Sequence, residues 1–195
     1  MKKILFLVVI PFITIFAGEP PAERAIGLFF SVGVGPRFPI GNFSNSTDLG
    51  YGLNVELSYT DNEIMPFFLF VKGGYEQFPG SQKFYQVTSY SNYSINSIPL
   101  SLGARYYFKP LLENILLFIP IAEASVNFNN YSILHQFKES ANRNNYTVNM
   151  SKFGFSAGIG FSTFLIELLG SYNYYQSNEF LSMDLKIRLP LYIIY

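Results

Sequence analysis

Apolar and polar residues alternate most regularly near the end of the chain. From Leu181 to Tyr195 every second residue is apolar, and the residues between them up to Arg188 are serine or charged. This alternation predicts one extended β-strand with an apolar face and a charged face. Strands of soluble sheets mostly have about 5 to 6 residues, whereas about 9 to 11 tilted residues cross a bilayer. The length of the run therefore favours a strand that spans a membrane.

Seven earlier stretches repeat the alternation, although Phe68 and Phe70 interrupt it in the third. They run from Ile26 to Arg37, Tyr51 to Tyr59, Met65 to Phe78, Ser97 to Phe108, Leu116 to Phe128, Lys152 to Phe161 and Phe164 to Tyr174. The fifth is apolar on both faces, and we place Glu123, Ser125 and Asn127 inside because a charge facing lipid near the midplane is costly. The pattern predicts an all-β fold, an eight-stranded antiparallel transmembrane up-and-down barrel with a side-chain-filled interior.

The connections between these strands differ in length. Three are long and rich in Asn, Ser and Tyr, namely Phe38 to Gly50, Pro79 to Asn96 and Asn129 to Tyr146, and the connections between them are short. The last connection, Gln176 to Glu179, is also short. Bacterial membrane barrels have long extracellular loops and short periplasmic turns. We therefore expect the three long loops outside the cell and both chain ends on the periplasmic side.

The N-terminal segment has the order of a secretory signal. Lys2 and Lys3 precede an apolar run from Ile4 to Phe16, and the small residues Ala17 and Gly18 follow. This order predicts a signal peptide over 1–18 and a barrel domain over 19–195. A membrane anchor is the alternative, but the run is shorter than the roughly 20 residues that a spanning helix needs.

Composition narrows the possible chemistry. The chain has no Cys, a single His at position 135 and a formal net charge of zero. Thiolate catalysis and disulfides are therefore excluded, and we expect no transition metal and no cofactor. The neutral balance also argues against a nucleic-acid partner, since such proteins usually carry a basic stripe.

Charged residues gather on the predicted inner face. They are Arg37, Glu56, Lys72, Glu76, Arg105, Glu123, Lys152, Glu167, Asp184, Lys186 and Arg188. The interior of an eight-stranded barrel is only just wide enough for side chains, so cations and anions there should interlock as ion pairs. A narrow ion path or proton relay through these residues is the alternative interpretation.

Together, the signal segment, the eight strands and the sorted loops resemble small outer-membrane β-barrel families of Gram-negative bacteria, such as outer membrane protein X and the transmembrane domain of outer membrane protein A. The stretch Ser97 to Phe108 looks like a strand common in that group. The C-terminal pattern looks like the signal that the barrel-assembly machinery reads: Ile187, Leu189, Leu191, Ile193 and Tyr195. Family members more often end in Phe, so Tyr195 departs from the pattern.

The resemblance implies a location in the outer membrane. It also implies contact with outer-membrane lipid, and biogenesis through periplasmic chaperones and the assembly machinery. Because these families share an architecture more than an activity, the resemblance does not specify a function.

We expect a structural or surface-interaction role and no catalysis. Asn-Tyr-Ser or Asn-Tyr-Thr triplets begin at Asn92, Asn130 and Asn145 in the long loops, and this chemistry is typical of adaptable binding surfaces. An extracellular ligand at the loops, as in adhesion, is therefore the leading hypothesis. A narrow porin-like channel is the first alternative.

Two further alternatives remain open at this point. A lipid A-modifying barrel enzyme would use His135 with Ser132 and Glu139, but the His-x-Ser pairing expected of a deacylase-like barrel is missing. A soluble lipocalin-like barrel would place apolar residues inside, whereas the charges here alternate toward the inside.

Overall fold

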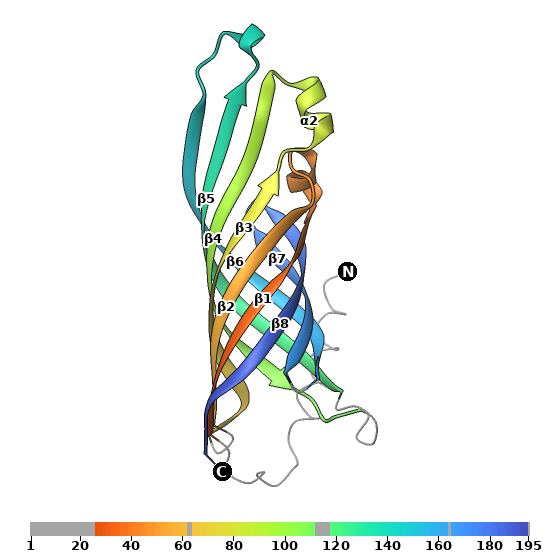
Figure 1. Cartoon of the computed structure of the whole chain (residues 1–195), viewed down its shortest axis with the longest axis vertical. Helices are drawn as coiled ribbons and strands as arrows, with labels where there is room; N and C mark the ends of the chain where they lie inside the picture. Colours follow the sequence, from red (N-terminus) through yellow and green to blue (C-terminus); the bar gives the residue numbers. More distant parts are fainter. Residues whose placement is uncertain (1–25, 62–63, 112–117, 164, 195) are drawn as a thin grey trace, which may run out of the picture.

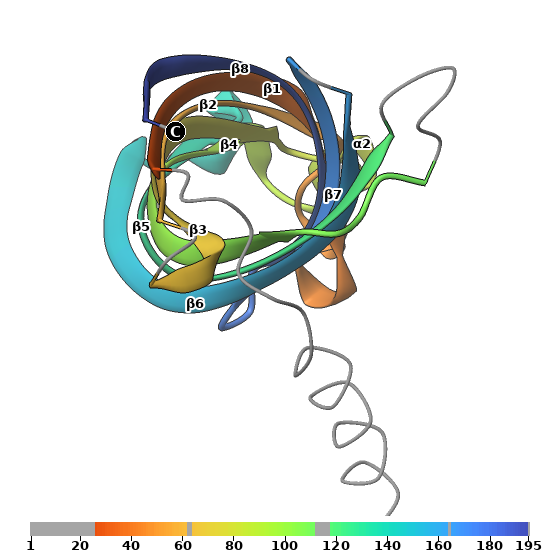
Figure 2. The ribbon, with the colours of Figure 1, turned by 90° about the horizontal axis from the view of Figure 1, so that it is seen from below.

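The computed structural model describes residues 26–61, 64–111, 118–163 and 165–194. The segment assigned to the signal peptide lies outside these ranges, as do Phe164 and Tyr195. Eight strands form a closed ring in which each pairs antiparallel with the next along the chain, and β8 pairs with β1 (Figure 2). The strands are β1 (Ile26–Ile40), β2 (Gly50–Asp61), β3 (Met65–Pro79), β4 (Tyr90–Tyr107), β5 (Ile119–Phe137), β6 (Tyr146–Thr163), β7 (Ile166–Tyr175) and β8 (Glu179–Ile194). The expected up-and-down barrel is confirmed.

The two faces of the strands follow the alternation in the sequence. In β8, Leu185 and Ile187 are about half exposed on the outside, whereas Asp184 and Lys186 are buried in the lumen. In β5, Glu123 is likewise buried inside. The outside of the barrel is therefore a belt of aliphatic and aromatic side chains. Exposed apolar surface of this extent is the kind that lipid covers.

Strands β4, β5 and β6 are longer than the sequence analysis predicted. β4 begins at Tyr90, β5 continues to Phe137 and β6 begins at Tyr146, so the prediction of long loops over these segments was wrong. The three strands project beyond the others on the loop side (Figure 1). Their Asn, Ser and Tyr content suggested loops, but Tyr93 and Ile95 still alternate with polar residues at the period of a strand.

We call the part of β4, β5 and β6 that extends beyond the other strands the projecting sheet. Its polar face lies outside and its apolar face inside, which is the opposite of the barrel wall. Above the apolar belt its convex face carries polar groups, including Ser151, whose Oγ donates a hydrogen bond of 2.6 Å to Asn130 Oδ1. Its concave face carries buried Tyr93, Ile95 and Ile133. A convex face of hydroxyls and amides suits water and not hydrocarbon, so the strands leave the lipid at this level.

Short helices occupy three connections on the projecting side. They are η1 (Gly41–Asn45), α2 (Gln82–Val87) and η2 (Glu139–Ala141). The side chain of Ser81 accepts a hydrogen bond of 3.2 Å from Phe84 N, which caps the start of α2. In the described part of the chain, no helix has the length and apolarity to cross a membrane.

Candidate functional site

The inner end of the lumen is closed around one arginine. The guanidinium carbon of Arg188 lies 3.9 Å from the ring centre of Phe29, 4.5 Å from that of Phe68 and 4.9 Å from that of Tyr107. One of its nitrogens lies 3.3 Å from Glu167. Contacts of a cation with ring faces are favourable, and more so away from water. Phe68, which interrupts the alternation in the sequence, in fact belongs to the inner face.

The middle of the lumen is filled by ion pairs centred on Arg105. Its guanidinium lies 2.8 Å from Glu56, 2.6 Å from Glu123 and 3.2 Å from Glu167. Lys186 lies 2.9 Å from Glu56. Charge-assisted hydrogen bonds of this kind compensate each group for its loss of water. We call this group the central ion-pair cluster: Glu56, Lys72, Arg105, Glu123, Glu167, Lys186 and Arg188.

A second group of ion pairs lies further toward the outside. Arg37 Nε is 2.9 Å from Glu76 and Nη2 is 3.0 Å from Asp184. Asn54 donates a hydrogen bond of 3.0 Å to the same Asp184 oxygen. We call Arg37, Glu76 and Asp184 the outer ion-pair cluster. The cavity between the two clusters has a volume of about 20 Å³, close to the room that one water molecule needs.

The structure therefore pairs all the sequence-predicted lumen charges except Lys152. The ammonium of Lys152 donates hydrogen bonds of 2.7 Å to Gln176 O and 3.2 Å to Asn178 Oδ1. It has no carboxylate partner within the described ranges. Lys152 lies on the inner face, with its ammonium 5.7 Å from the ring centre of Tyr131, at the level of the turn between β7 and β8 and outside both ion-pair clusters.

An apolar layer closes the lumen above the ion pairs. Phe78 lies at its centre, with ring centres 4.9 Å from Phe43 and 5.2 Å from Phe180. The layer consists of Phe43, Phe78, Tyr93, Ile95, Tyr131, Ile133, Tyr175 and Phe180. With Arg188 below and this layer above, a hydrated ion would have to break packed contacts at both ends. Among the residues that the structure describes, the lumen is therefore packed at both ends, and this packing does not support the porin-like alternative.

Aromatic side chains continue from this layer onto the concave face of the projecting sheet. His135 stacks on Tyr146 with ring centres 4.5 Å apart, and Tyr90 lies 4.8 Å from Phe137. Burial lowers the pKa of the His135 imidazole below its ordinary value, which favours the neutral ring. We call this surface the aromatic face: Phe84, Tyr90, Tyr93, His135, Phe137 and Tyr146.

The trio considered for a hydrolase is not assembled. His135 belongs to β5 and not to a loop, and its ring faces the concave side against Tyr93 and Tyr146. Ser132 is an odd number of residues away on the same strand, so its side chain points to the opposite, convex face. Glu139 lies beyond the strand in η2. These residues offer no nucleophile and base within hydrogen-bond reach.

The two edges of the projecting sheet differ. At the β4 edge, Gly80 N donates a hydrogen bond of 2.7 Å to Tyr93 O, and Tyr85 Oη both donates to Tyr93 O at 2.9 Å and accepts from Tyr93 N at 3.0 Å. At the other edge, β6 pairs with β5 from Tyr146 onward, but its pairing with β7 begins only at Gly154. We call Tyr146 to Phe153 the free edge, because no backbone partner faces it among the residues that the structure covers.

The Tyr85→Phe variant is expected to expose the backbone of the β4 edge at Tyr93. Without the hydroxyl, the amide of Tyr93 loses its partner, which should lower the free energy of unfolding by about 1 to 2 kcal/mol. Hydrogen exchange at the Tyr93 amide, measured by nuclear magnetic resonance, should become faster. Tyr59→Phe is the matched control, since Tyr59 is a lipid-facing tyrosine of β2. Unchanged exchange at Tyr93 would contradict the capping role.

Comparisons with known proteins bear on the fold. No known protein family matches the sequence, and no curated protein is significantly similar to it. Neisserial surface protein A is 16% identical over 86% of this chain and 99% of that chain, with a TM-score of 0.51. The chain thus has the fold of the small eight-stranded outer-membrane barrels.

Two other solved structures are similar. The attachment invasion locus protein of Yersinia pestis, solved in complex with the heparin analogue sucrose octasulfate, is 9% identical over 86% of this chain and 100% of that chain, with a TM-score of 0.46. The N-terminal β-barrel domain of OprF from Pseudomonas aeruginosa is 12% identical over 84% of this chain and 98% of that chain, with a TM-score of 0.45.

Proposed function

We propose that the protein resides in the bacterial outer membrane and captures an extended peptide segment of an extracellular partner at the free edge of β6. The observation that carries this proposal is the backbone of Tyr146 to Phe153, which pairs with β5 on one side and, within the described ranges, with no strand on the other. An extended peptide can add to such an edge and form main-chain hydrogen bonds along it.

Among the residues with described positions, the free edge lacks the features that normally prevent strand addition. Natural sheets protect their edges with proline, charged residues, bulges or a covering segment. Tyr146 to Phe153 contains no proline, and its one charged residue, Lys152, is turned toward Gln176 and Asn178. The opposite edge of the same sheet is covered by Gly80 and Tyr85. This asymmetry supports a role for the open edge.

The side chains along the edge indicate what the peptide should look like. Tyr146, Val148 and Met150 lie on the concave side, because they pair with His135, Ile133 and Tyr131 of β5. Tyr146 is itself part of the aromatic face. The residues between them, Thr147, Asn149 and Ser151, lie on the polar convex side. A peptide with alternating apolar and polar residues would match both sides. A second copy in the same membrane would run parallel to β6, so it could not form an antiparallel ladder at this edge.

The closed lumen supports a surface role over conduction or catalysis. Export through a signal peptide cleaved after residue 18 belongs to the same proposal. So does an assembly signal at the C-terminal end, whose residues Ile187, Leu189, Leu191 and Ile193 are exposed on the lipid side. The sixteen-residue strand β8 would thus serve both lipid contact and biogenesis.

Peptide binding to the refolded barrel tests the proposal. A fluorescent peptide of alternating Val and Thr should bind, and the same peptide N-methylated at alternate residues should bind at least tenfold more weakly, because each lost hydrogen bond costs about 0.5 to 1.5 kcal/mol. Hydrogen exchange in the segment from Tyr146 to Phe153 should slow when the unmodified peptide binds. Equal affinity of the two peptides, or protection elsewhere only, would refute strand addition.

A substitution within the free edge provides a second test of the proposal. Met150→Lys places a charge in the middle of the edge, as edge-protecting lysines do in natural sheets, and should weaken binding about fivefold or more. Ser140→Lys is the matched control, because Ser140 is exposed in η2, away from the edge. If both lysine variants weaken binding equally, the effect is one of net charge and the edge is not the site.

A further inference from the structure

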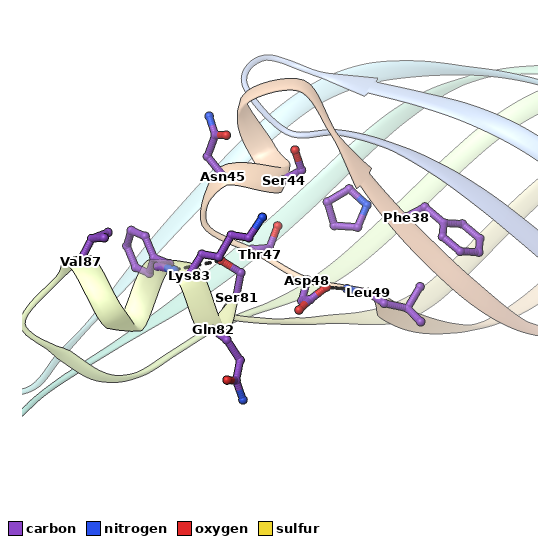
Figure 3. A pocket seen from close by; sticks show the side chains of 12 residues that line it. Phe38, Ser44, Asn45, Thr47, Asp48, Leu49, Ser81, Gln82, Lys83 and Val87 are labelled. Atoms are coloured by element: carbon purple, nitrogen blue, oxygen red, sulfur yellow. Dashed lines mark hydrogen bonds between the residues drawn. The ribbon is translucent and has the colours of Figure 1, made fainter.

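A groove lies at the outer rim of the barrel, between the connection that holds η1 and helix α2 (Figure 3). Its volume is about 780 Å³, within the range of roughly 300 to 1,000 Å³ for small-molecule sites. The two walls are joined by backbone hydrogen bonds, Ser81 N to Ser46 O at 3.0 Å and Asp48 N to Pro79 O at 2.8 Å. The groove is therefore built by two connections that hold each other in place.

The end of the groove nearest the barrel is lined by the apolar side chains of Phe38 and Leu49, whereas Val87 lies at the far end, on α2 (Figure 3). Phe38 and Leu49 are 42% and 54% exposed. Arg37 and Gly50, which pair across β1 and β2, are buried toward the lumen, so their neighbours Phe38 and Leu49 point outward. This side continues the apolar belt of the barrel. Apolar surface left in this position is stabilised by contact with hydrocarbon.

The other side of the groove offers polar groups without partners. The side chains of Asn45 and Lys83 make no hydrogen bond or ion pair among the described residues. Asp48 uses one carboxylate oxygen to accept a hydrogen bond of 3.0 Å from Leu49 N. Figure 3 shows the Lys83 side chain extending from α2 toward the connection that carries Ser44 and Thr47. A cation, a carboxylate and an amide thus line the same groove.

We propose that this groove binds the phosphorylated sugar headgroup of an outer-leaflet glycolipid. Lys83 would bind a phosphate as a point charge, and Asp48 and Asn45 would bind sugar hydroxyls. The acyl chains would lie along Phe38 and Leu49, in line with the apolar belt. That continuity is why the occupant is a membrane lipid and not a soluble sugar phosphate. The groove is a site separate from the free edge of β6, so either proposal can fail without the other.

Lipid binding to the barrel in detergent micelles, measured by native mass spectrometry, tests this inference. The probes are purified lipid A, dephosphorylated lipid A and the deacylated phosphorylated disaccharide. Lys83→Gln should weaken binding of lipid A roughly five- to tenfold, as expected for an exposed charge-assisted contact. It should leave binding of the dephosphorylated form unchanged. Arg143→Gln, which removes an exposed cation at the tip between β5 and β6, should have no effect.

A second variant addresses the apolar side. Leu49→Ser should weaken binding of lipid A and leave binding of the deacylated disaccharide unchanged, because only the acylated probe reaches this side chain. If the deacylated disaccharide binds as tightly as lipid A, the acyl chains do not contribute to binding. The proposal that the occupant is a membrane lipid would then be overturned. If Lys83→Gln and Arg143→Gln weaken binding of lipid A equally, the lipid is attracted by the net charge of the protein alone. The proposed site in the groove would then be refuted.

Discussion

Replacement of Arg105 by methionine is expected to lower the free energy of unfolding of the barrel by about 3 to 5 kcal/mol, the usual cost of removing one partner of a buried ion pair. The guanidinium lies within 3.2 Å of carboxylates from three strands, Glu56, Glu123 and Glu167. Without it these carboxylates stay in the lumen, away from water, with fewer cations around them. Methionine fills much of the same space, so the loss reports on charge and not on a cavity.

Urea unfolding in phosphatidylcholine vesicles, followed by gel migration of unboiled samples, measures this change. Arg143→Met is the matched control, because Arg143 is exposed and its loss should change stability by less than about 0.5 kcal/mol. Adding Glu123→Gln to Arg105→Met should recover part of the loss, since it removes one of the stranded charges. Equal unfolding midpoints for the two methionine variants would show that the central ion-pair cluster does not hold the barrel together.

Gly35→Ala is expected to destabilise the barrel by about 3 kcal/mol or more, at or above the upper range for overpacking. A Cβ at position 35 would overlap the carbonyl oxygen of Met183 and crowd the backbone of Asp184. Both belong to β8, the strand that pairs with β1 to close the ring. Because the obstacle is backbone and not a flexible side chain, the methyl group can be accommodated only by moving the two strands apart.

Gly73→Ala is the matched control for this closure. Gly73 lies in β3, and a Cβ there would meet nothing within 4 Å. The substitution should be neutral or should stabilise the barrel by up to about 1 kcal/mol, since alanine restricts the unfolded chain. The fraction of refolded protein that migrates as the compact form before boiling should fall for Gly35→Ala only. A similar fall for both variants would mean that close approach of β1 and β8 is not the cause.

The distribution of packed and open surface follows from these contacts. Ion pairs and the layer around Phe78 make the lumen a rigid support, while the chain extends β4, β5 and β6 past the lipid belt. At that end, the described residues leave hydrogen-bonding groups unused at the free edge of β6 and on the polar side of the groove between η1 and α2, and binding there would add contacts without breaking any.

Strand identity and facing could be predicted from the sequence because side-chain alternation is a local property of an extended chain. Asp184, Lys186 and Arg188 point inward simply because Leu185 and Ile187 point outward. The same rule placed Glu123 correctly in a stretch that is apolar on both sides. The prediction failed where it relied on amino-acid composition and not on the period of the alternation. The segment from Asn129 to Phe137 was expected to be a loop because it is rich in Asn and Ser, yet it is part of strand β5.

The partner of each charge could not be predicted in this way. That Arg105 of β4 meets carboxylates of β2, β5 and β7 depends on the tilt and stagger of strands around the ring, which no local pattern encodes. The free edge and the position of Lys152 depend on a difference in length, since β6 begins at Tyr146 whereas β7 ends opposite Gly154. The alternation in the sequence thus determined which side of the sheet each residue occupies. The closed ring alone decided which residues meet across the lumen and which are left without a neighbour at its rim.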